Sequence, residues 1–425
     1  ISGAIIRKRC FTLKRISNTL GWYSQLMNDT RGTSASRATA VERAVSGMII
    51  ALAAAAAGGI FALWLQSRPP LTFALSVPGM DDPLGRRAAD AGGEADKGVA
   101  IGALFTAFDG QPAELPGSWP RFRGEHFDNI ARQDVPLADR WPEGGPPELW
   151  SVELGEGFAG PAIQRGRVFL MDYDEEAGAD MLRCFSLADG GELWRRGYAL
   201  HVKRNHGMSR TVPAVTDDFV VTIGPKCHVM CVDMRDGGFR WGLDLVRDFG
   251  TEEPGWYTGQ CPLIDDGVAV LAPAGDAVLM MGVDCASGRV LWQTPNPDGL
   301  QMSHASIMPM TLNGRRMYVY AALGGMVGVA ADGERAGDIL WKTLGWTARA
   351  IAPSPVMLPE GRIFVTAGYA AGSKLFHVEG DEASGYTIEL LGSWTPREGL
   401  ASEQHTPIYY RDHLFLPNGM PVTRD

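Results

Sequence analysis

A short phrase in which a Gly precedes a Trp by four residues recurs along the chain at nearly even spacing. The complete copies are ADGGELW (188–194), RDGGFRW (235–241), ASGRVLW (286–292) and RAGDILW (335–341). A fifth copy, ASGYTIE (383–389), keeps the Gly and has Glu389 in the place of the Trp. Successive glycines lie 47, 51, 49 and 48 residues apart, a period that is typical of propellers and of helical arrays. These glycines are Gly190, Gly237, Gly288, Gly337 and Gly385.

The residues between the copies favour a propeller, because they read as short strands. In residues 211–245, apolar β-rich runs alternate with the breakers DD, GP and DGG, and residues 261–295 repeat this pattern. Each unit predicts four short strands joined by tight turns, which is the make-up of a propeller blade. The roughly 3.6-residue periodicity of helical repeats is not found in these windows. The predicted fold is therefore all-β, a β-propeller of four-stranded blades.

About five and a half blades are expected within the chain, and roughly seven or eight in a complete propeller. PPELWSVELG (146–155) resembles the outer strand of a blade whose first three strands are absent. In closed propellers an N-terminal strand commonly completes the last blade, so we expect the propeller to be truncated at its C-terminal side. The expected blades are 158–198, 206–249, 256–296, 302–345 and 351–395, with a sixth begun at 403–416.

The repeated phrase is interpreted as the hairpin between the third and fourth strands of each blade. Its Asp/Ser-Gly pair supplies a turn that needs a positive φ angle. The Trp follows on the outer strand, where a large flat side chain can fill the wedge between neighbouring blades. A stacking surface for sugars or bases is the alternative role for these residues. The expected blade-docking residues are Trp194, Trp241, Trp292 and Trp341.

The front of the chain differs from the rest in charge. Residues 1–45 are basic, whereas no charged residue occurs from Ala44 to Ser67, a stretch whose apolar centre is long enough to cross a bilayer. We expect a basic cytoplasmic segment at 1–45, a transmembrane signal-anchor helix at 46–66, a flexible linker at 67–117 and the propeller at 118–425. A cleaved signal peptide and a buried core helix remain alternatives for the apolar stretch.

Net charge and cysteine positions argue against two functions, nucleic-acid binding and metal binding. The formal net charge of −10 disfavours nucleic acid as a partner, because nucleic-acid binding requires a basic face. Cys227 and Cys231, with His228 between them, are candidate metal ligands. The residues around them, however, have the pattern of a β-strand. Four residues of strand span roughly 13 Å, too far for one zinc ion to bridge without a sharp bulge. We expect buried apolar cysteines and no metal site.

The phrase at this spacing resembles the blades of quinoprotein-like propellers, a superfamily that includes pyrroloquinoline-quinone alcohol dehydrogenases and the outer-membrane assembly propeller lipoprotein. The segment SWPRFRGEHFDN (118–129) is similar to the lead-in of membrane-anchored bacterial members. The resemblance covers about 118–425 and implies the fold more than the activity. It also implies a possible pyrroloquinoline quinone with calcium. The adjacent Cys-Cys pair of those dehydrogenases has no counterpart here, so no cofactor and no catalytic residue are assigned.

The residues just before each innermost strand are expected to line the mouth of the central channel. Three of the eight His residues, His206, His304 and His405, fall at equivalent places in their blades. Such residues can bind an anion through Arg210 and protonated His, or a metal through neutral His. They can also simply hydrogen-bond backbone and water in a wet channel. The candidate mouth residues are His206, Arg210, Tyr257, Gln260, His304, Glu403, Gln404 and His405, with Asn205 and Trp256 beside them.

Two main functions compete. The first is a non-catalytic scaffold, single-pass in a bacterial inner membrane, whose propeller binds a protein or cell-envelope component on the periplasmic side. The second is a periplasmic oxidoreductase that depends on pyrroloquinoline quinone or a metal. A carbohydrate-binding or glycan-cleaving propeller ranks last, because it requires two facing carboxylates and Glu403 is the one acid among the mouth candidates. The sequence favours the scaffold.

Overall fold

The computed structural model describes residues 98–132, 138–204 and 208–417, together with scattered helical residues between 45 and 59. The predicted segment at 1–44, most of the predicted span at 46–66 and residues 67–97 lie outside the described residues. No helix in the described part of the chain is long and apolar enough to cross a membrane. The strands belong to one compact unit, which includes residues 82–425, and this unit is described by itself.

The described strands of this unit form five blades and a two-stranded sheet, all antiparallel. Each blade has four strands paired in chain order, and the sheet of blade 1 has a fifth strand at its edge. Blade 1 holds β2 (Ala162–Gln164), β3 (Arg167–Asp174), β4 (Ala179–Ser186) and β5 (Glu192–Ala199). Blade 2 holds β6 (Ala214–Val215), β7 (Phe219–Ile223), β8 (His228–Asp233) and β9 (Phe239–Asp244), followed by the short helix α3 (Leu245–Phe249). Blade 3 holds β10 (Leu263–Asp265), β11 (Val268–Leu271), β12 (Val278–Asp284) and β13 (Val290–Pro295).

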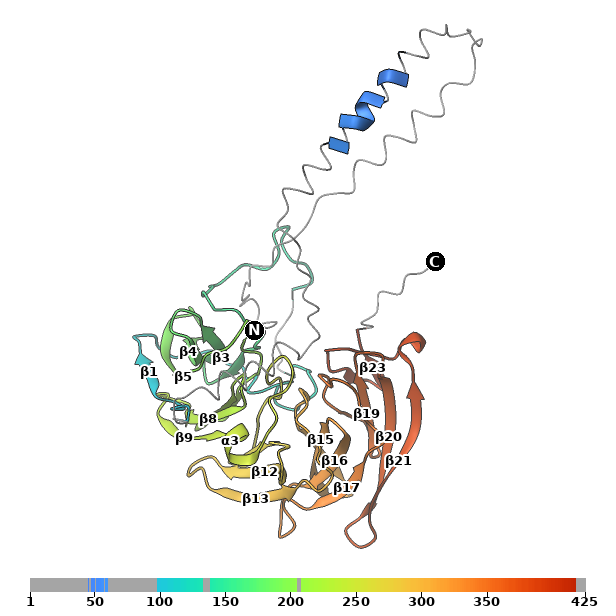
Figure 1. The fold of residues 1–425 in the computed structure, drawn as a ribbon. Coiled ribbons are helices and arrows are strands. Elements are labelled where there is room, and N and C mark those ends of the chain that lie inside the picture. Colours follow the sequence, from blue (N-terminus) through green and yellow to red (C-terminus); the bar gives the residue numbers. More distant parts are fainter. Residues whose placement is uncertain are drawn as a thin grey trace. The chain divides into compact units, whose positions relative to one another are not determined.

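The last blades continue the same order. Blade 4 holds β14 (Met308–Leu312), β15 (Arg315–Ala322), β16 (Gly325–Ala330) and β17 (Ile339–Thr343). Blade 5 holds β18 (Val356–Met357), β19 (Arg362–Ala367), β20 (Gly372–Asp381) and β21 (Gly385–Trp394), followed by the 3-10 turn η1 (Pro396–Glu398). The two-stranded sheet holds β22 (Ile408–Tyr410) and β23 (His413–Phe415). Figure 1 shows the blades of this unit following one another around a curved array. The predicted all-β fold of four-stranded blades is confirmed, and the transmembrane helix stays a prediction.

The structure differs from the expected linker at 67–117 in one stretch. β1 (Leu104–Ala107) pairs antiparallel with β5 and forms a fifth strand on the outer edge of blade 1. The ring of Phe105 lies 4.2 Å from the guanidinium carbon of Arg196, and Arg196 Nη1 donates to Gly102 O at 2.5 Å. This stretch is therefore part of the folded unit, not a linker.

The repeated turns of blades 2, 3 and 4 dock against the preceding blade through their Gly, and the turn of blade 1 docks in the same way against Trp150. A Cβ atom added at Gly237 would lie 2.6 Å from Cε3 of Trp194, because the indole packs directly over the turn. The turn glycines therefore serve two needs at once: a left-handed backbone and a flat surface for the indole. The turn of blade 5 is different, since a Cβ at Gly385 would meet nothing within 4 Å. The four Trp–Gly contacts are Trp150 with Gly190, Trp194 with Gly237, Trp241 with Gly288 and Trp292 with Gly337.

A second set of inter-blade contacts joins the innermost strands at their N-terminal ends. Cys261 N donates to Ser306 Oγ at 3.0 Å, Ser306 N donates to Ser354 Oγ at 2.9 Å, and Ser354 N donates to Thr406 Oγ1 at 2.9 Å. Val212 N donates to Cys261 Sγ at 3.2 Å in the same way. We call this set, Val212, Cys261, Ser306, Ser354 and Thr406, the inner belt. It fixes the blade spacing next to the channel.

The lead-in segment, residues 118–132, lies against the inner strands of several blades. Trp119 forms an isolated bridge with Ile163 of blade 1, and Pro120 O accepts from Val215 N of blade 2 at 2.8 Å. Its two arginines reach further blades: Arg121 Nη1 donates to Ile264 O at 3.0 Å and Arg123 Nη1 to Thr406 O at 3.3 Å. Because inner strands surround the axis of a propeller, a segment that contacts so many of them occupies the end of the channel.

Candidate functional site

The predicted mouth residues lie at one end of the blades. Connections between antiparallel strands alternate between the two ends of a sheet, so the segments that lead into the innermost strands share an end with the turns between second and third strands. We call this end the mouth face. The opposite end, which carries the repeated turns, is the turn face. The structure describes all the predicted mouth residues except Asn205 and His206, which lie outside the described residues.

An aromatic and cationic stack crosses the mouth face over blades 3, 4 and 5. The rings of Trp256 and Tyr369 stack with centroids 6.0 Å apart at an interplanar angle of 18°. The guanidinium of Arg349 lies 5.7 Å from the centre of the Tyr369 ring, and His304 lies 6.2 Å from Trp256 on the other side. Tyr369 is 48% exposed and Arg349 is also exposed. We call Trp256, Tyr369 and Arg349 the mouth stack.

The backbone that presents the mouth stack is strained. Trp256, Tyr257, Tyr369 and Ala370 have φ angles of 65°, 68°, 55° and 64°, a left-handed region that bulky residues rarely adopt. Each such residue costs roughly 1–3 kcal/mol and persists where the surrounding structure enforces it, often at functional sites. Two separate strained turns therefore hold the rings of Trp256 and Tyr369 together in a fixed geometry.

Two half-buried basic groups, Arg210 and His304, accompany the mouth stack. Burial, together with the nearby charge of Arg210, lowers the pKa of His304 to about 4, so the imidazole is neutral at pH 7. Burial also lowers the pKa of Arg210. Tyr257 is buried beside both groups, and its hydroxyl donates to Lys203 O at 2.8 Å. The site thus has one fixed cation near the aromatic rings.

The structure brings some predicted mouth residues together and leaves others apart. Arg210, Tyr257 and His304 form one group. Gln260 is fully buried between blades 3 and 4, where its Nε2 donates to Tyr320 Oη at 3.1 Å and to Ala272 O at 3.4 Å. Gln404 and His405 are exposed, and so is Glu403, whose side chain packs against Gly368 next to Tyr369.

Two residues of the mouth stack are absent from the predicted set. Arg349 precedes an innermost strand just as Arg210 does, so its position in the repeat could have signalled it. Tyr369 lies in the turn between β19 and β20, where nothing in the repeat marks it. It reaches the mouth because that turn and the connections into the inner strands share one end of the blades.

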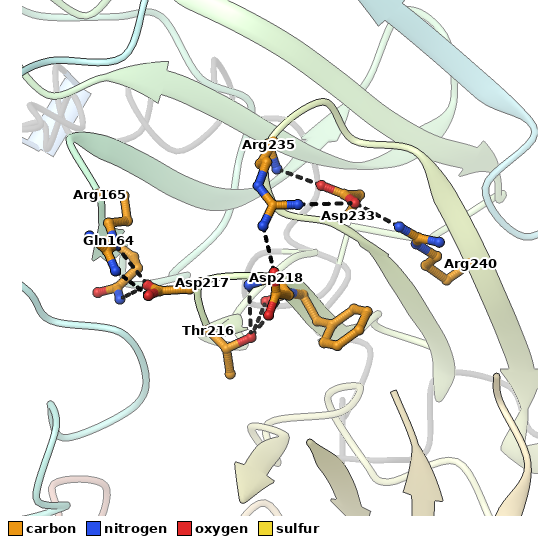
Figure 2. Close-up of polar contacts among 9 residues, drawn as sticks. Gln164, Arg165, Thr216, Asp217, Asp218, Asp233, Arg235 and Arg240 are labelled. Atoms are coloured by element: carbon orange, nitrogen blue, oxygen red, sulfur yellow. Dashed lines mark hydrogen bonds and ion pairs between the residues drawn. The ribbon is translucent and has the colours of Figure 1, made fainter. Parts of the chain in front are cut away.

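On the turn face, charges of neighbouring blades pair with one another. Figure 2 shows Asp217, in the turn between β6 and β7, accepting from Gln164 Nε2 at 2.8 Å and from Arg165 Nε at 2.9 Å of blade 1. The hydrogen bond from Arg165 lowers the pKa of Asp217 to about 2. Within blade 2, Arg235 donates to Asp218 at 2.6 Å. These pairs tie blades and turns together, so their role is structural.

The mouth face does not fit a quinone with calcium. Calcium takes six to eight oxygen ligands, mainly carboxylates, and among the described mouth candidates Glu403 is the one carboxylate. The described residues hold no group of three or more His, Cys, Asp or Glu placed to bind a metal ion. The five described cysteines, Cys184, Cys227, Cys231, Cys261 and Cys285, are free and buried.

Parts of this chain are similar to known proteins. BamB from Moraxella catarrhalis aligns at 14% identity over 62% of this chain and 69% of that chain, with a TM-score of 0.41. A quinohemoprotein alcohol dehydrogenase from Comamonas testosteroni aligns at 13% identity over 52% of this chain and 45% of that chain, with a TM-score of 0.35. No curated protein matches. The family model described as "Outer membrane protein assembly factor BamB" matches residues 178–375, a range in which the structure has antiparallel four-stranded blades.

Proposed function

We propose that the chain is a binding module that holds a protein or another cell-envelope component against its mouth face. The observation that carries this proposal is the exposed mouth stack of Trp256, Tyr369 and Arg349. Trp, Tyr and Arg are the residues that most often supply the binding energy of protein interfaces. The stack is held rigid by strained turns, so a partner would order few additional side chains on binding.

The proposal includes a location for the module. The basic segment at 1–45 and the apolar span at 46–66 support a single-pass anchor in a bacterial inner membrane, with the propeller on the periplasmic side. Fractionation of cells that express the full chain tests the anchor. The wild type is expected in the alkali-resistant membrane fraction, and a chain with two Asp residues in place of Ala53 and Ala54 is expected to leave it.

Site-specific photo-crosslinking in the native host tests the binding face. A photoreactive phenylalanine analogue at Tyr369 is expected to give discrete crosslinked species. The same analogue at Leu390 on β21 is the matched control, because Leu390 is 52% exposed against 48% for Tyr369. Arg349→Ala is expected to weaken crosslinking from position 369 several-fold. Equal crosslinking from both positions would show that the mouth face is not selective.

The oxidoreductase alternative has a separate test. The full chain is titrated with pyrroloquinoline quinone and calcium while the thermal midpoint is followed, since a ligand that binds the folded state raises it. We expect no saturable shift, because of the carboxylate-poor mouth described above. A saturable rise would contradict the non-catalytic assignment and call for substrate screens.

A further inference from the structure

A cavity lies beside the inner strands, between them and the lead-in segment. Its volume is about 360 Å³, and it opens between the lead-in segment and the inner strands of blades 4 and 5 and the two-stranded sheet. Eight of its thirteen lining residues are apolar or aromatic, and three arginines also contribute to the lining. The wall includes Phe127, Ile130, Met308, Val356, Met357 and Tyr410.

Arg123 is the unusual member of this wall. Its side chain is buried, and the residue is only 3% exposed. Its Nε donates to Phe127 O at 2.7 Å and its Nη1 to Thr406 O at 3.3 Å, and both acceptors are uncharged. Within the part of the chain that the structure describes, no carboxylate forms an ion pair with Arg123, and its Nη2 has no hydrogen-bond partner. A buried charge is costly unless an opposite charge compensates it.

The remaining charges of the cavity compensate Arg123 only in part. The charge of Asp128 acts on Arg123 from a distance, while Asp128 forms its ion pair with Arg132 at 2.5 Å. Arg411 lies 5.0 Å from the centre of the Tyr410 ring and is exposed at the rim. The described lining thus carries a net charge of about +2 with His126 neutral, which attracts an anion.

The backbone around Arg123 is held in an unfavourable shape. Arg123, Phe127 and Asn129 have φ angles of 65°, 60° and 63°, three left-handed residues within one short segment. Asn129 N donates to Arg123 O at 3.0 Å, and the indole of Trp119 packs against Gly124, so the turn is closed on itself. Strain of this kind is retained where a site needs a fixed geometry. Here it places the guanidinium of Arg123 at the cavity wall.

We propose that this cavity binds a small carboxylate that carries an apolar body. The carboxylate would accept from Arg123 Nη2 and lie near Arg411, and the apolar body would pack against Phe127, Met357 and Tyr410. One negative charge is sufficient for the buried guanidinium, and charged hydrogen bonds of this type are the strong ones. An inorganic phosphate, which is polar on all sides, would leave the apolar wall without a complementary surface. The site is independent of the proposed function, because its lining shares no residue with the mouth stack.

Calorimetric titration of the full chain tests this site with three probes: hexanoate, its neutral counterpart hexanol, and inorganic phosphate. Hexanoate is expected to bind with one site per chain and a Kd below about 1 mM, at least tenfold more tightly than either other probe. Arg123→Lys keeps the charge and removes the planar fork, and it is expected to weaken hexanoate at least tenfold. Arg411→Gln is expected to weaken it about threefold to tenfold.

Arg289→Gln is the matched control, because Arg289 is an exposed arginine outside the lining of the cavity and outside the mouth stack. It is expected to leave hexanoate binding unchanged. If Arg123→Lys fails to fold, the Arg411→Gln variant alone tests the proposal. The Arg411 side chain is exposed, so its replacement should not disturb the folded core. The proposal is overturned if hexanoate does not bind, if hexanol or phosphate binds as tightly, or if the variants at 123 and 411 bind like the control.

Discussion

Ser306 occupies the middle of the inner belt and is 3% exposed. Its hydroxyl accepts from Cys261 N, so Ser306→Ala would leave a buried N–H without a partner. We expect a loss of about 1–3 kcal/mol of unfolding free energy, measured by urea denaturation. Ser306→Cys is the control, because the thiol of Cys261 already accepts from Val212 N at the equivalent place. A cysteine that costs as much as the alanine would show that the acceptor is unimportant.

The turn glycines allow the cost of backbone strain to be separated from the cost of lost docking. Gly237 and Gly385 have similar φ angles of 70° and 78°, but only Gly237 lies under a tryptophan. Gly385→Ala is expected to cost about 1 kcal/mol, from the left-handed backbone alone. Gly237→Ala is expected to cost about 1–3 kcal/mol more, because its Cβ would overlap Trp194. Equal thermal midpoints for the two variants would refute a docking role for the phrase.

Asp180 is a fully buried carboxyl between blade 1 and the segment that enters blade 2. Tyr198 Oη and Ser209 Oγ donate to it at 3.0 and 2.8 Å. Burial, with a smaller contribution from Asp172, raises the pKa of Asp180 to about 7, so the folded protein keeps a proton that the unfolded chain loses above about pH 4. Stability should therefore fall as the pH rises from 4 to 7.

Asp180→Asn tests this linkage, because an amide cannot ionise. Between pH 4 and 7 the wild type is expected to lose about 2–4 kcal/mol of unfolding free energy relative to the variant. Thermal denaturation of both proteins across this range provides the measurement. Parallel pH profiles would mean that Asp180 ionises normally in the folded state.

β1 shows how an outer edge of a blade is covered. Its pairing with β5 is short, and Phe105 and Phe108 add contacts to Arg196 and Arg195. We expect slow amide exchange at 104–107, and faster exchange at 111–117, where the structure has no strand. Thr106→Pro should abolish the protection of β1 and expose the edge of β5, because proline removes a donor from the pairing. Unchanged exchange in β5 would show that β1 does not cover it.

The sequence predicted the blades because the turn residues between strands recur at similar positions in each blade. Breakers at fixed offsets separate the runs that become β7, β8 and β9, and the same offsets return in blade 3. β1 was missed because LFTA is four residues long and is surrounded by Gly, Pro and Ala, so neither periodicity nor length marks a strand. It becomes a strand only through the edge of β5, which is a tertiary effect.

The candidate sites were less predictable from the sequence, because they too depend on tertiary contacts. Position in the repeat was enough to find Arg210 and His304, which share one kind of segment. It could not find Tyr369, because a different turn of another blade brings it to the mouth face. The lead-in motif was visible as SWPRFRG, but the burial of Arg123 depends on Thr406, 283 residues away.

Across the whole molecule, the apolar core is divided unevenly among the blades. One cluster runs through blades 2, 3 and 4, and includes Val229, Met280 and Val327. A second cluster, which includes Ile363 and Phe376, joins blade 5 to blade 4 alone. The Trp–Gly contact that links the earlier neighbours is also missing at Gly385. In repeat proteins stability is close to a sum of such neighbour terms, so the junction before blade 5 should be the weakest among the described blades.

Native-state hydrogen exchange at low urea tests this order of opening. Amides of β19 are expected to exchange through a partial opening of lower free energy than amides of β11 and β12. Phe376→Ala should lower the opening free energy of β19 by about 3 kcal/mol and leave β11 nearly unchanged, whereas Met280→Ala should act mainly on β11 and β12. A single opening free energy for all three strands would mean that the blades unfold as one unit. A lower opening free energy for β19 would show that blade 5 opens separately from blades 2 to 4. This result is expected because apolar contacts reach only the neighbouring blade, so blade 5 is stabilised by blade 4 alone.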